Sequence, residues 1–587
     1  MSGATSLRFA LQAERAAMNA LRHTLLGAGL AALLAGLPGA SPARAAALDA
    51  DHIRREVVEA LERIGGTGQD RVLLWRAVEV KPEGDALRIA LDDLALRLDE
   101  ENPVPLGTAT FRLAGREDGT YQLDDLRLPD ELRLGTPKDL TTIRIPKLEL
   151  SGRWSPRLQT FLALQGGVHG LTAVGRDGLG SLGGLTVSIS TAEKDGAIAG
   201  GDFAVAIDGL SVQGEDKTGL SLRTFAVGGR WSPELPYLLA LDARVEALSA
   251  GDSSSHGSLD RLTYKLDMTD KGGGRWDETM AVVVDGAKIV DPGSFSFSLG
   301  ELGMSGHVEG VDFAAAARIG VALDELGSRT PAAADLATLM SDIGRMFPSS
   351  GANEFRIADL AASDQTEGWT VALATARLRA EMAGFDGDAA RSQGELAYGG
   401  LAVATGSHDM DQALSVLLPG RVAVSVKLED VPARRLLGIL VDQARSGAGS
   451  AGRQQSADPE ALLTEAAPQL QAAVQQAGSK LRISPSELES PAARLTLDGH
   501  GEAAAASPLG GVAALTIEIA GLDRIIVAGK ALLGPDEADG AKAFDLLRLA
   551  SVRKKAADGT LVDRYVLVLS PEGEITVNDK PIDSLLQ

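Results

Sequence analysis

Hydrophobic and polar residues alternate with a period of two over most of the chain between about residues 73 and 403. A period of two places every second side chain on the same face of a β-strand. We therefore predict a long series of strands, each with one apolar and one polar face. The clearest examples are Leu87, Ile89 and Leu91, then Leu185, Val187 and Ile189, then Phe203, Val205 and Ile207.

Short segments that contain Gly beside charged residues separate these strands. Asp and Gly tolerate the backbone angles that tight hairpin turns require. Because such turns join neighbouring strands, their spacing predicts an antiparallel meander. The four turn segments are 117–119, 194–196, 270–272 and 366–368.

Two segments carry a helical period instead. Apolar residues recur at intervals of three and four from Ile53 to Ile64, with Asp51 placed to cap the helix and Gly65 placed to end it. A Thr-Pro start and a following proline frame a second helix over 330–347. The meander is thus expected to begin with one helix and to be interrupted by another.

The pattern changes beyond about Ser407, where a strand runs into a helix twice. The first copy is the alternating segment 422–428 followed by the helical segment 432–441, and the second is 513–519 followed by 522–526. We therefore predict a C-terminal α+β unit that contains a duplicated strand-helix element. The expected fold class of the whole chain is α+β, mostly β, built on an extended antiparallel meander sheet.

Composition places a linker inside this C-terminal region. Residues 446–457 are rich in Gly and Ser, which predicts a flexible connection, and the segment 458–460 is typical of a helix start. The chain closes with a hairpin over 565–582. The expected domains are a leader at 1–45, a helix plus β-rich meander at 46–406, and the α+β region at 407–587.

The N-terminus has the features of a secretory signal peptide. Basic residues up to Arg22 precede an apolar run over 24–37, and the small residues Ala43 and Ala45 define a cleavage site before Ala46. The apolar run is shorter than the ~20 residues that span a bilayer. We therefore expect export to the periplasm of a Gram-negative type cell.

Two starts are compatible with this leader. A chain that begins at Met18 would carry a signal of conventional length, so the sequence leaves Met1 and Met18 open as the true start. No later stretch approaches ~20 uninterrupted apolar residues. The mature chain is therefore expected to have no transmembrane helix.

Composition and charge exclude several classes of function. The 587 residues are 44% hydrophobic and 23% charged, which is a globular composition, and the formal net charge is −23. Such a surface repels phosphate, so neither nucleic-acid binding nor electrostatic adhesion of the whole chain to anionic headgroups is expected. The absence of Cys excludes disulfides, thiol catalysis and an acylated lipoprotein Cys.

A short sequence recurs in the meander. Arg153-Trp154 and Arg230-Trp231 are each followed by Ser-Pro and a Leu-rich strand, and Arg275-Trp276 is a weaker third copy. The recurrence suggests supersecondary units repeated in series. The Arg-Trp pairs could form a ledge on which a ligand stacks, but an Arg packed on a Trp at a strand end is the simpler interpretation.

The residues that could carry catalysis or hold a cofactor do not form a recognisable site. The His residues are scattered singly, and Asp386-Gly387-Asp388 lacks the rest of a calcium loop. The Gly-x-Gly-x-x-Gly pattern at 178–183 is followed by a strand instead of the helix that a dinucleotide needs, so we interpret it as a turn. We predict no enzyme, cofactor or metal, although paired-carboxylate hydrolysis depends on spatial separation and stays open.

The closing strand, together with the leader, the meander and the strand-helix units, resembles YdgA-like exported proteins and, more loosely, AsmA-like envelope proteins. The resemblance lies in Thr576-Val577-Asn578-Asp579-Lys580-Pro581, where Asp579 replaces an expected Gly. It covers the last third of the chain, and the meander only in style. It implies an envelope location and extended β architecture, with lipid handling on the AsmA-like side. It provides no catalytic residues.

A one-faced sheet must close on itself, meet a second layer or hold something apolar. We therefore predict a non-catalytic binding or scaffolding protein of the envelope that holds a lipid or another amphiphile on its sheet. A filled two-layer core explains the same alternation, and a structural partner of an envelope complex and a hydrolase are the alternatives. The candidate apolar groove consists of Val187, Ile189, Phe203, Val205 and Ile207.

Overall fold

The computed structural model describes most of the chain after residue 48 and divides it into two compact units, 1–266 and 267–587. This division differs from the boundary expected at 406/407. The predicted leader and its cleavage residues Ala43, Ala45 and Ala46 lie outside the described residues. The described residues are 49–65, 72–97, 103–134, 140–176, 178–214, 217–252, 254–328, 333–450, 459–532, 538–556 and 559–584.

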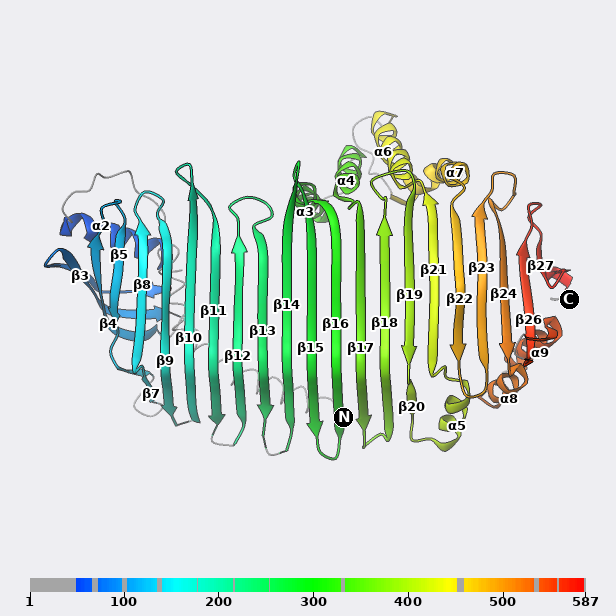
Figure 1. The fold of residues 1–587 in the computed structure, drawn as a ribbon, viewed down its shortest axis with the longest axis horizontal. Helices are drawn as coiled ribbons and strands as arrows, with labels where there is room; N and C mark the ends of the chain where they lie inside the picture. The colour runs from blue at the N-terminus through cyan, green and yellow to red at the C-terminus, as the bar shows by residue number, and fades with distance from the viewer. Residues whose placement is uncertain are drawn as a thin grey trace. The chain divides into compact units, whose positions relative to one another are not determined.

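Unit 1 consists of one described helix followed by a series of strands (Figure 1). Its elements are α2 (Ala50–Gly65), β1 (Leu73–Leu74), β2 (Ala77–Glu83), β3 (Ala86–Arg97), β4 (Pro103–Gly115), β5 (Tyr121–Arg127), β6 (Glu131–Leu134), β7 (Thr141–Arg144), β8 (Lys147–Ser155), β9 (Thr160–Gly175), β10 (Gly178–Lys194), β11 (Ala197–Gly214), β12 (Gly219–Trp231) and β13 (Leu238–Gly251), and β14 (His256–Gly272) contains the boundary between the units.

The strands of unit 1 pair antiparallel, mostly with their neighbours in sequence. The main order is β2-β3-β4-β5-β8-β9-β10-β11-β12-β13, and β6 and β7 form a side hairpin that pairs with β9. The core lies where α2 covers the first strands. Ile53 of α2 joins a buried cluster with Ile89 and Phe161, all at most 1% exposed.

Unit 2 is also a series of antiparallel strands, but with more helices. Its elements are β15 (Arg275–Asp291), β16 (Phe295–Asp312), α3 (Phe313–Ser328), α4 (Ala333–Met346), β17 (Ser350–Asp364), β18 (Trp369–Ala383), β19 (Ala390–Gly399), β20 (Ala402–Ala404), α5 (His408–Leu417), β21 (Arg421–Val431), α6 (Ala433–Ser450), α7 (Pro459–Ala477), β22 (Lys480–Glu489), β23 (Arg494–Ala503), β24 (Gly511–Ala520), α8 (Leu522–Leu532), α9 (Ala538–Ala550), β25 (Val552–Lys555), β26 (Leu561–Leu569), β27 (Ile575–Val577), β28 (Lys580–Pro581) and a final 3₁₀ turn (Ile582–Ser584).

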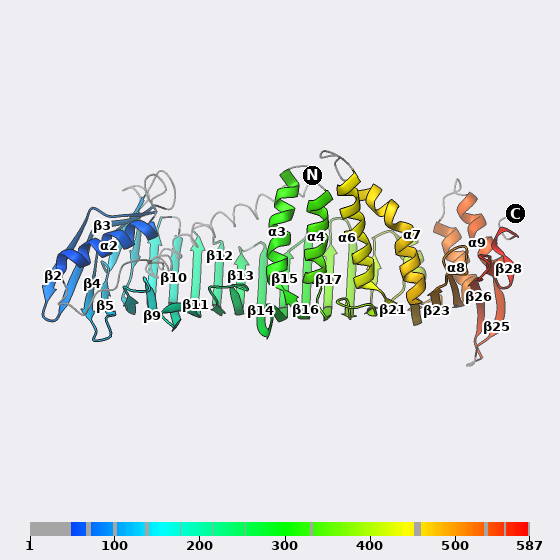
Figure 2. The same ribbon diagram turned by 90° about the horizontal axis from the view of Figure 1, so that it is seen from above.

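The helices of unit 2 gather on one side of its sheet. Figure 2 shows α3, α4, α6, α7, α8 and α9 on the same side of the strands. α3 packs on α4, α4 on α6 and α6 on α7, so these four form a layer of their own. At the C-terminal end, Leu522 and Ile525 of α8 pack against Tyr565 of β26 in a separate buried cluster.

A row of backbone irregularities crosses β9 to β13 in unit 1 and β15 to β18 in unit 2. Gly170, Gly209 and Ala247 have positive φ values of 70°, 63° and 49° in β9, β11 and β13, and Asp359 in β17 has φ 52°. The ladder skips one residue on each of these strands; for example, Leu182 pairs with Leu210 and the next pair is Gly184 with Asp208. The skipped residue resets the alternation and keeps the apolar side chains on one face.

The expected fold class is confirmed: the protein is α+β and mostly β, with antiparallel meanders. The helix at 51–64, both strand-helix copies and the closing hairpin are also present. Four details differ. The glycines at 178–183 belong to strand β10, the turn expected at 270–272 lies at 273–274, residues 446–450 of the expected linker are helical, and the helix α3 was not predicted.

Two of these differences from the predicted structure have a local cause. The glycines at 178–183 pair with both β9 and β11, so the ladder holds them in a strand. The helix α6 continues to Ser450, and the Ser446 hydroxyl donates a hydrogen bond to the carbonyl of Asp442 one turn earlier, so this serine is accommodated inside the helix. The remaining linker residues, 451–457, lie outside the described residues.

Candidate functional site

The structure brings the five predicted groove residues together on one face of unit 1. Val187 of β10 lies directly opposite Val205 of β11, and Ile189 lies opposite Phe203. Ile207, which pairs with Leu185, continues the same face along β11. The hairpin turn at Asp195-Gly196 joins the two strands, and the alternation then keeps all five side chains on one side.

This face continues over the next two strands. Val205 is opposite Val227 of β12, and Val227 is opposite Ala243 of β13. Beyond the row of skipped residues, Leu182 and Leu210 form a small buried cluster with Leu185. The described helix of unit 1, α2, packs on β1 and β2, and the residues on β11 are only half-buried. The aliphatic side chains of β10 to β13 therefore shield one another mainly across the strands.

Unit 2 contains a more exposed version of the same feature, which we call the unit 2 apolar row: Met304, Phe355, Leu378 and Leu396. The four side chains lie on β16, β17, β18 and β19 and are directly opposite one another in the ladder. They are 41%, 38%, 50% and 43% exposed, respectively. Side chains under a second packed layer would be far less exposed, so this part of the face is open among the described residues.

The apolar row continues at both ends into smaller residues. Val282 of β15 is opposite Met304, and Val424 of β21 is opposite Leu396. Six adjacent strands thus present apolar side chains at one level. The sequence does not mark these residues as a site, because each strand contributes only one of them and their alignment depends on the register of five consecutive strand pairs.

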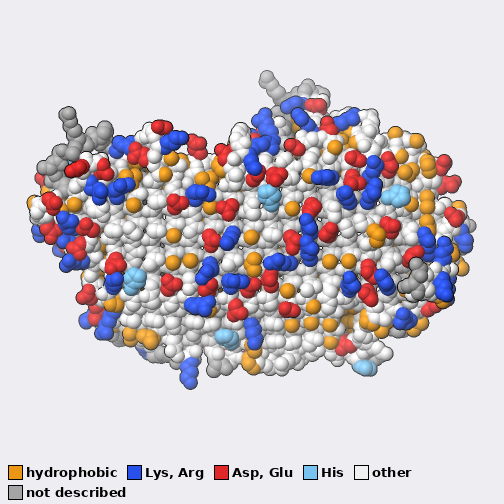
Figure 3. All heavy atoms as spheres, in the orientation of Figure 1, with side chains coloured by type: hydrophobic (Ala, Val, Ile, Leu, Met, Phe, Trp, Pro, Cys, Tyr) orange, Lys and Arg blue, Asp and Glu red, His pale blue; other side chains and the backbone are white. Residues whose placement is uncertain are grey.

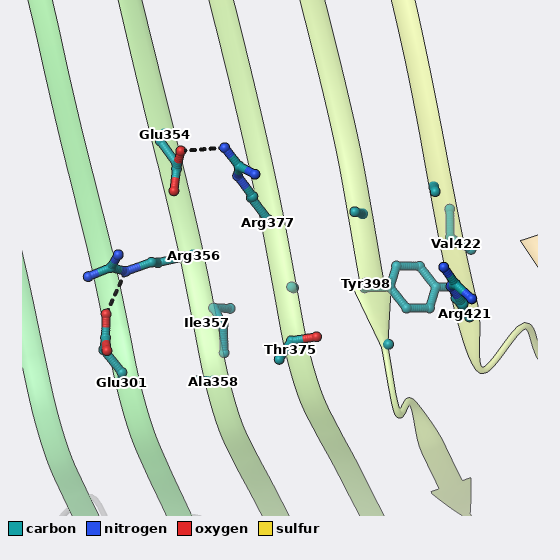
Figure 4. A pocket seen from close by; sticks show the side chains of 14 residues that line it. Glu301, Glu354, Arg356, Ile357, Ala358, Thr375, Arg377, Tyr398, Arg421 and Val422 are labelled. Atoms are coloured by element: carbon teal, nitrogen blue, oxygen red, sulfur yellow. Dashed lines mark hydrogen bonds and ion pairs between the residues drawn. The ribbon is translucent and has the colours of Figure 1, made fainter. Parts of the chain in front are cut away.

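The opposite face of the same strands is polar. Arg356 Nε lies 2.5 Å from Glu301 Oε1, and Arg377 Nη2 lies 2.8 Å from Glu354 Oε2, each pair on adjacent strands (Figure 4). These side chains border a hollow of about 610 Å³. Positive and negative side chains are interspersed over the face seen in Figure 3, so their charges largely compensate each other. One face is therefore solvated and charged and the other is aliphatic.

Figure 4 also shows where the strands bend. The ribbons change direction near Ala358 and Thr375, next to the skipped residue Asp359. Bulge-like irregularities increase bending and twist in a sheet. The row of irregularities is therefore a crease that curves the sheet beside the apolar row.

One hydrogen-bonded network on β15 to β17 has the connectivity of a nucleophile, a base and an acid. Thr279 Oγ1 is 3.1 Å from His307 Nδ1, and His307 Nε2 is 3.2 Å from Glu309 Oε1. Glu309 also accepts a hydrogen bond from Ser350, which is the main reason why its pKa lies below the usual value. The side chains of His307 and Glu309 are 45% and 47% exposed, and their contacts are those of directly paired or alternate strand residues. A surface ladder accounts for the arrangement without catalysis.

The repeated Arg-Trp pairs share a structural feature. The ladder shifts register between Arg153 and Trp154, between Arg230 and Trp231, and just after Trp276. Trp154 packs edge-to-face on Phe161 with ring centroids 5.0 Å apart. The repeat therefore marks β-bulges near strand ends, and at least one of its indoles belongs to the core.

Two kinds of feature are absent from the described residues. These residues contain no group of three or more His, Asp or Glu that could hold a metal ion. Within the same part of the chain, no helix is both long enough and apolar enough to cross a membrane.

Comparison with known proteins adds no identification. The chain matches no protein-family model, no curated protein and no solved structure. The resemblance to YdgA-like and AsmA-like proteins therefore stays a prediction from the sequence.

Proposed function

We propose that this chain is a non-catalytic envelope protein that holds the apolar part of a lipid or a similar amphiphile against the aliphatic face of its sheets. The observation that carries the proposal is the unit 2 apolar row, where four large side chains in direct register stay 38% to 50% exposed. Exposed apolar side chains in a contiguous set are typical of surfaces that bind an apolar partner.

The dimensions of the row suit an acyl chain. Val282 and Val424 are separated by five strand spacings of about 4.8 Å, which gives roughly 24 Å. A long acyl chain laid across the strands at this level would contact one apolar side chain on each of them. Each methylene group that leaves water contributes about 0.8 kcal/mol, so contact over several methylenes suffices for stable binding.

The envelope location belongs to the same proposal and is supported by the predicted leader. If the leader directs export, fractionated cells should contain the protein in the periplasm, with a mature N-terminus at or near Ala46. Edman sequencing or mass spectrometry of the purified protein measures this end. A full-length chain that remains in the cytoplasm would contradict the location.

Lipid binding can be tested with two adjacent substitutions on β19. Leu396 belongs to the apolar row, whereas Ala397 is exposed on the opposite, polar face, where Arg377 is its direct partner. Because both sites are exposed, Leu396→Asp and Ala397→Asp should both change the free energy of unfolding by less than about 1 kcal/mol. Native mass spectrometry should show co-purified lipid in the wild type and in Ala397→Asp, and at least tenfold less in Leu396→Asp. A lipid that covers residue 396 would have to remove water from the new carboxylate, which costs free energy.

Equal lipid occupancy in both variants would refute binding at the apolar row. A different result would favour the alternative function, in which the chain is a structural partner of an envelope complex. In that case no lipid would be recovered from any variant, and Leu396→Asp alone would release a protein that co-purifies with the wild type.

A further inference from the structure

The C-terminal end of unit 2 carries exposed apolar and basic side chains close together, which we call the C-terminal basic patch: Val527, Leu546, Leu549, Val552, Arg553, Lys554 and Lys555. Val527 on α8 is 71% exposed and Leu549 on α9 is 69% exposed. All four residues of the edge strand β25, Val552 to Lys555, are exposed. Exposed apolar side chains that gather in one place are typical of surfaces that bind an apolar partner.

Ion pairs place the two helices of the patch side by side. Lys530 of α8 lies 2.6 Å from Asp545 of α9, and Arg548 of α9 lies 3.6 Å from Asp523 of α8. Val527 is one turn from both Asp523 and Lys530 along α8, so it is on the side of α8 that carries these ion pairs. Leu549 follows Asp545 by one turn of α9 and extends the exposed apolar surface.

The cations of the patch divide into two groups. Arg548 and Arg553 both contact the buried carboxylate of Asp563, at 2.7 and 3.3 Å, and so contribute to the structure. Lys554 and Lys555 have no ion pair within the described part of the chain, and both are exposed. Residues 546–557 contain four cations and no acidic residue, in a chain whose net charge is −23.

We propose that the C-terminal basic patch docks the protein on an anionic phospholipid surface. Exposed leucines and valines provide the apolar contact that inserts below the headgroups, and the adjacent lysines attract the negative lipids. The strongly acidic remainder of the chain is repelled by the same surface, which orients the protein with this patch toward the membrane. The proposal does not depend on whether the sheet face holds a ligand.

The absence of Cys allows a site-specific test. Leu549→Cys and, as a matched control, Val321→Cys on α3 each introduce a single thiol for an environment-sensitive fluorophore, because Val321 is also apolar and 61% exposed. The labelled full-length chains are mixed with vesicles of phosphatidylcholine alone or of phosphatidylcholine with phosphatidylglycerol. The fluorophore at residue 549 should shift to shorter wavelength only with the anionic vesicles, and the fluorophore at residue 321 should not shift with either.

Charge removal completes the experiment. Lys554→Gln and Lys555→Gln together, in the Leu549→Cys chain, should require roughly thirtyfold more anionic lipid for the same shift, because each lysine near such a surface contributes about fivefold. No shift at residue 549, an equal shift at residue 321, or a shift that the two glutamines leave unchanged would each overturn the proposal. The Leu396→Asp variant should keep the shift, so failure of docking and failure of lipid binding by the sheet are distinguishable.

Discussion

Replacing Phe161 by alanine is expected to lower the free energy of unfolding of unit 1 by about 3–5 kcal/mol. Phe161 is 1% exposed and belongs to the core beneath α2, where its ring packs against Trp154. The ring occupies the space beside Gly152, which has no side chain of its own. The cavity that alanine would leave therefore has no side chain at residue 152 to fill it. Urea unfolding followed by circular dichroism measures the change.

Phe355→Ala is the matched control for this experiment. It removes the same atoms from a side chain that is 38% exposed, so it should cost about 1 kcal/mol or less. Similar losses for the two phenylalanines would mean that the core of unit 1 does not lie where α2 covers the strands.

The β architecture could be predicted because its signal is local. Each strand contains its own alternation, and turns such as Asp195-Gly196 and 366–368 occur where the chain must reverse. The helix α3 lacked such a signal. Its Val321 and Leu323 are exposed, so its apolar residues do not form one stripe that a helical period would reveal.

The candidate site was predictable only in part. Val187 and Val205 lie on strands that one hairpin joins, so alternation within each strand was enough to put each of them on an apolar face, whereas their direct pairing depends on the register shift at Ala192 and Glu193. Leu378 and Leu396 are aligned with Met304 through several successive registers, each of which contains a skipped residue or a turn. Errors in register accumulate over such a series, and a slip of one residue moves a side chain to the other face.

The net charge of the chain does not reveal where its positive charges gather. A net charge of −23 led to the expectation that the chain as a whole does not adhere to anionic headgroups. The face in Figure 3 carries interspersed charges of both signs. Electrostatic attraction acts only over about a Debye length, so a local cluster such as Lys554 and Lys555 acts independently of charges far from it. Only the placement of the strands shows that these lysines form an exposed edge beside exposed leucines.

Replacing Val205 by aspartate is expected to destabilise unit 1 by about 2–4 kcal/mol at neutral pH. Val205 lies between Val187 and Val227 on the adjacent strands, and these apolar partners cannot hydrogen-bond a carboxylate. Ala204→Asp is the matched control. Ala204 is exposed on the other face, opposite Ser188 and Gly228, so this substitution should cost about 0.5 kcal/mol or less.

The effect of Val205→Asp should depend on pH with a defined sign. Desolvation disfavours the charged carboxylate, so the pKa of the new side chain is higher in the folded than in the unfolded state. The variant therefore loses stability as pH rises from the unfolded-state pKa of about 3.9 through the folded-state pKa, and the difference from wild type is smallest in acid. Urea unfolding of both variants and the wild type at a series of pH values measures this. Equal tolerance of the two substitutions at neutral pH, or a cost that grows toward acid, would show that Val205 does not lie on the aliphatic face.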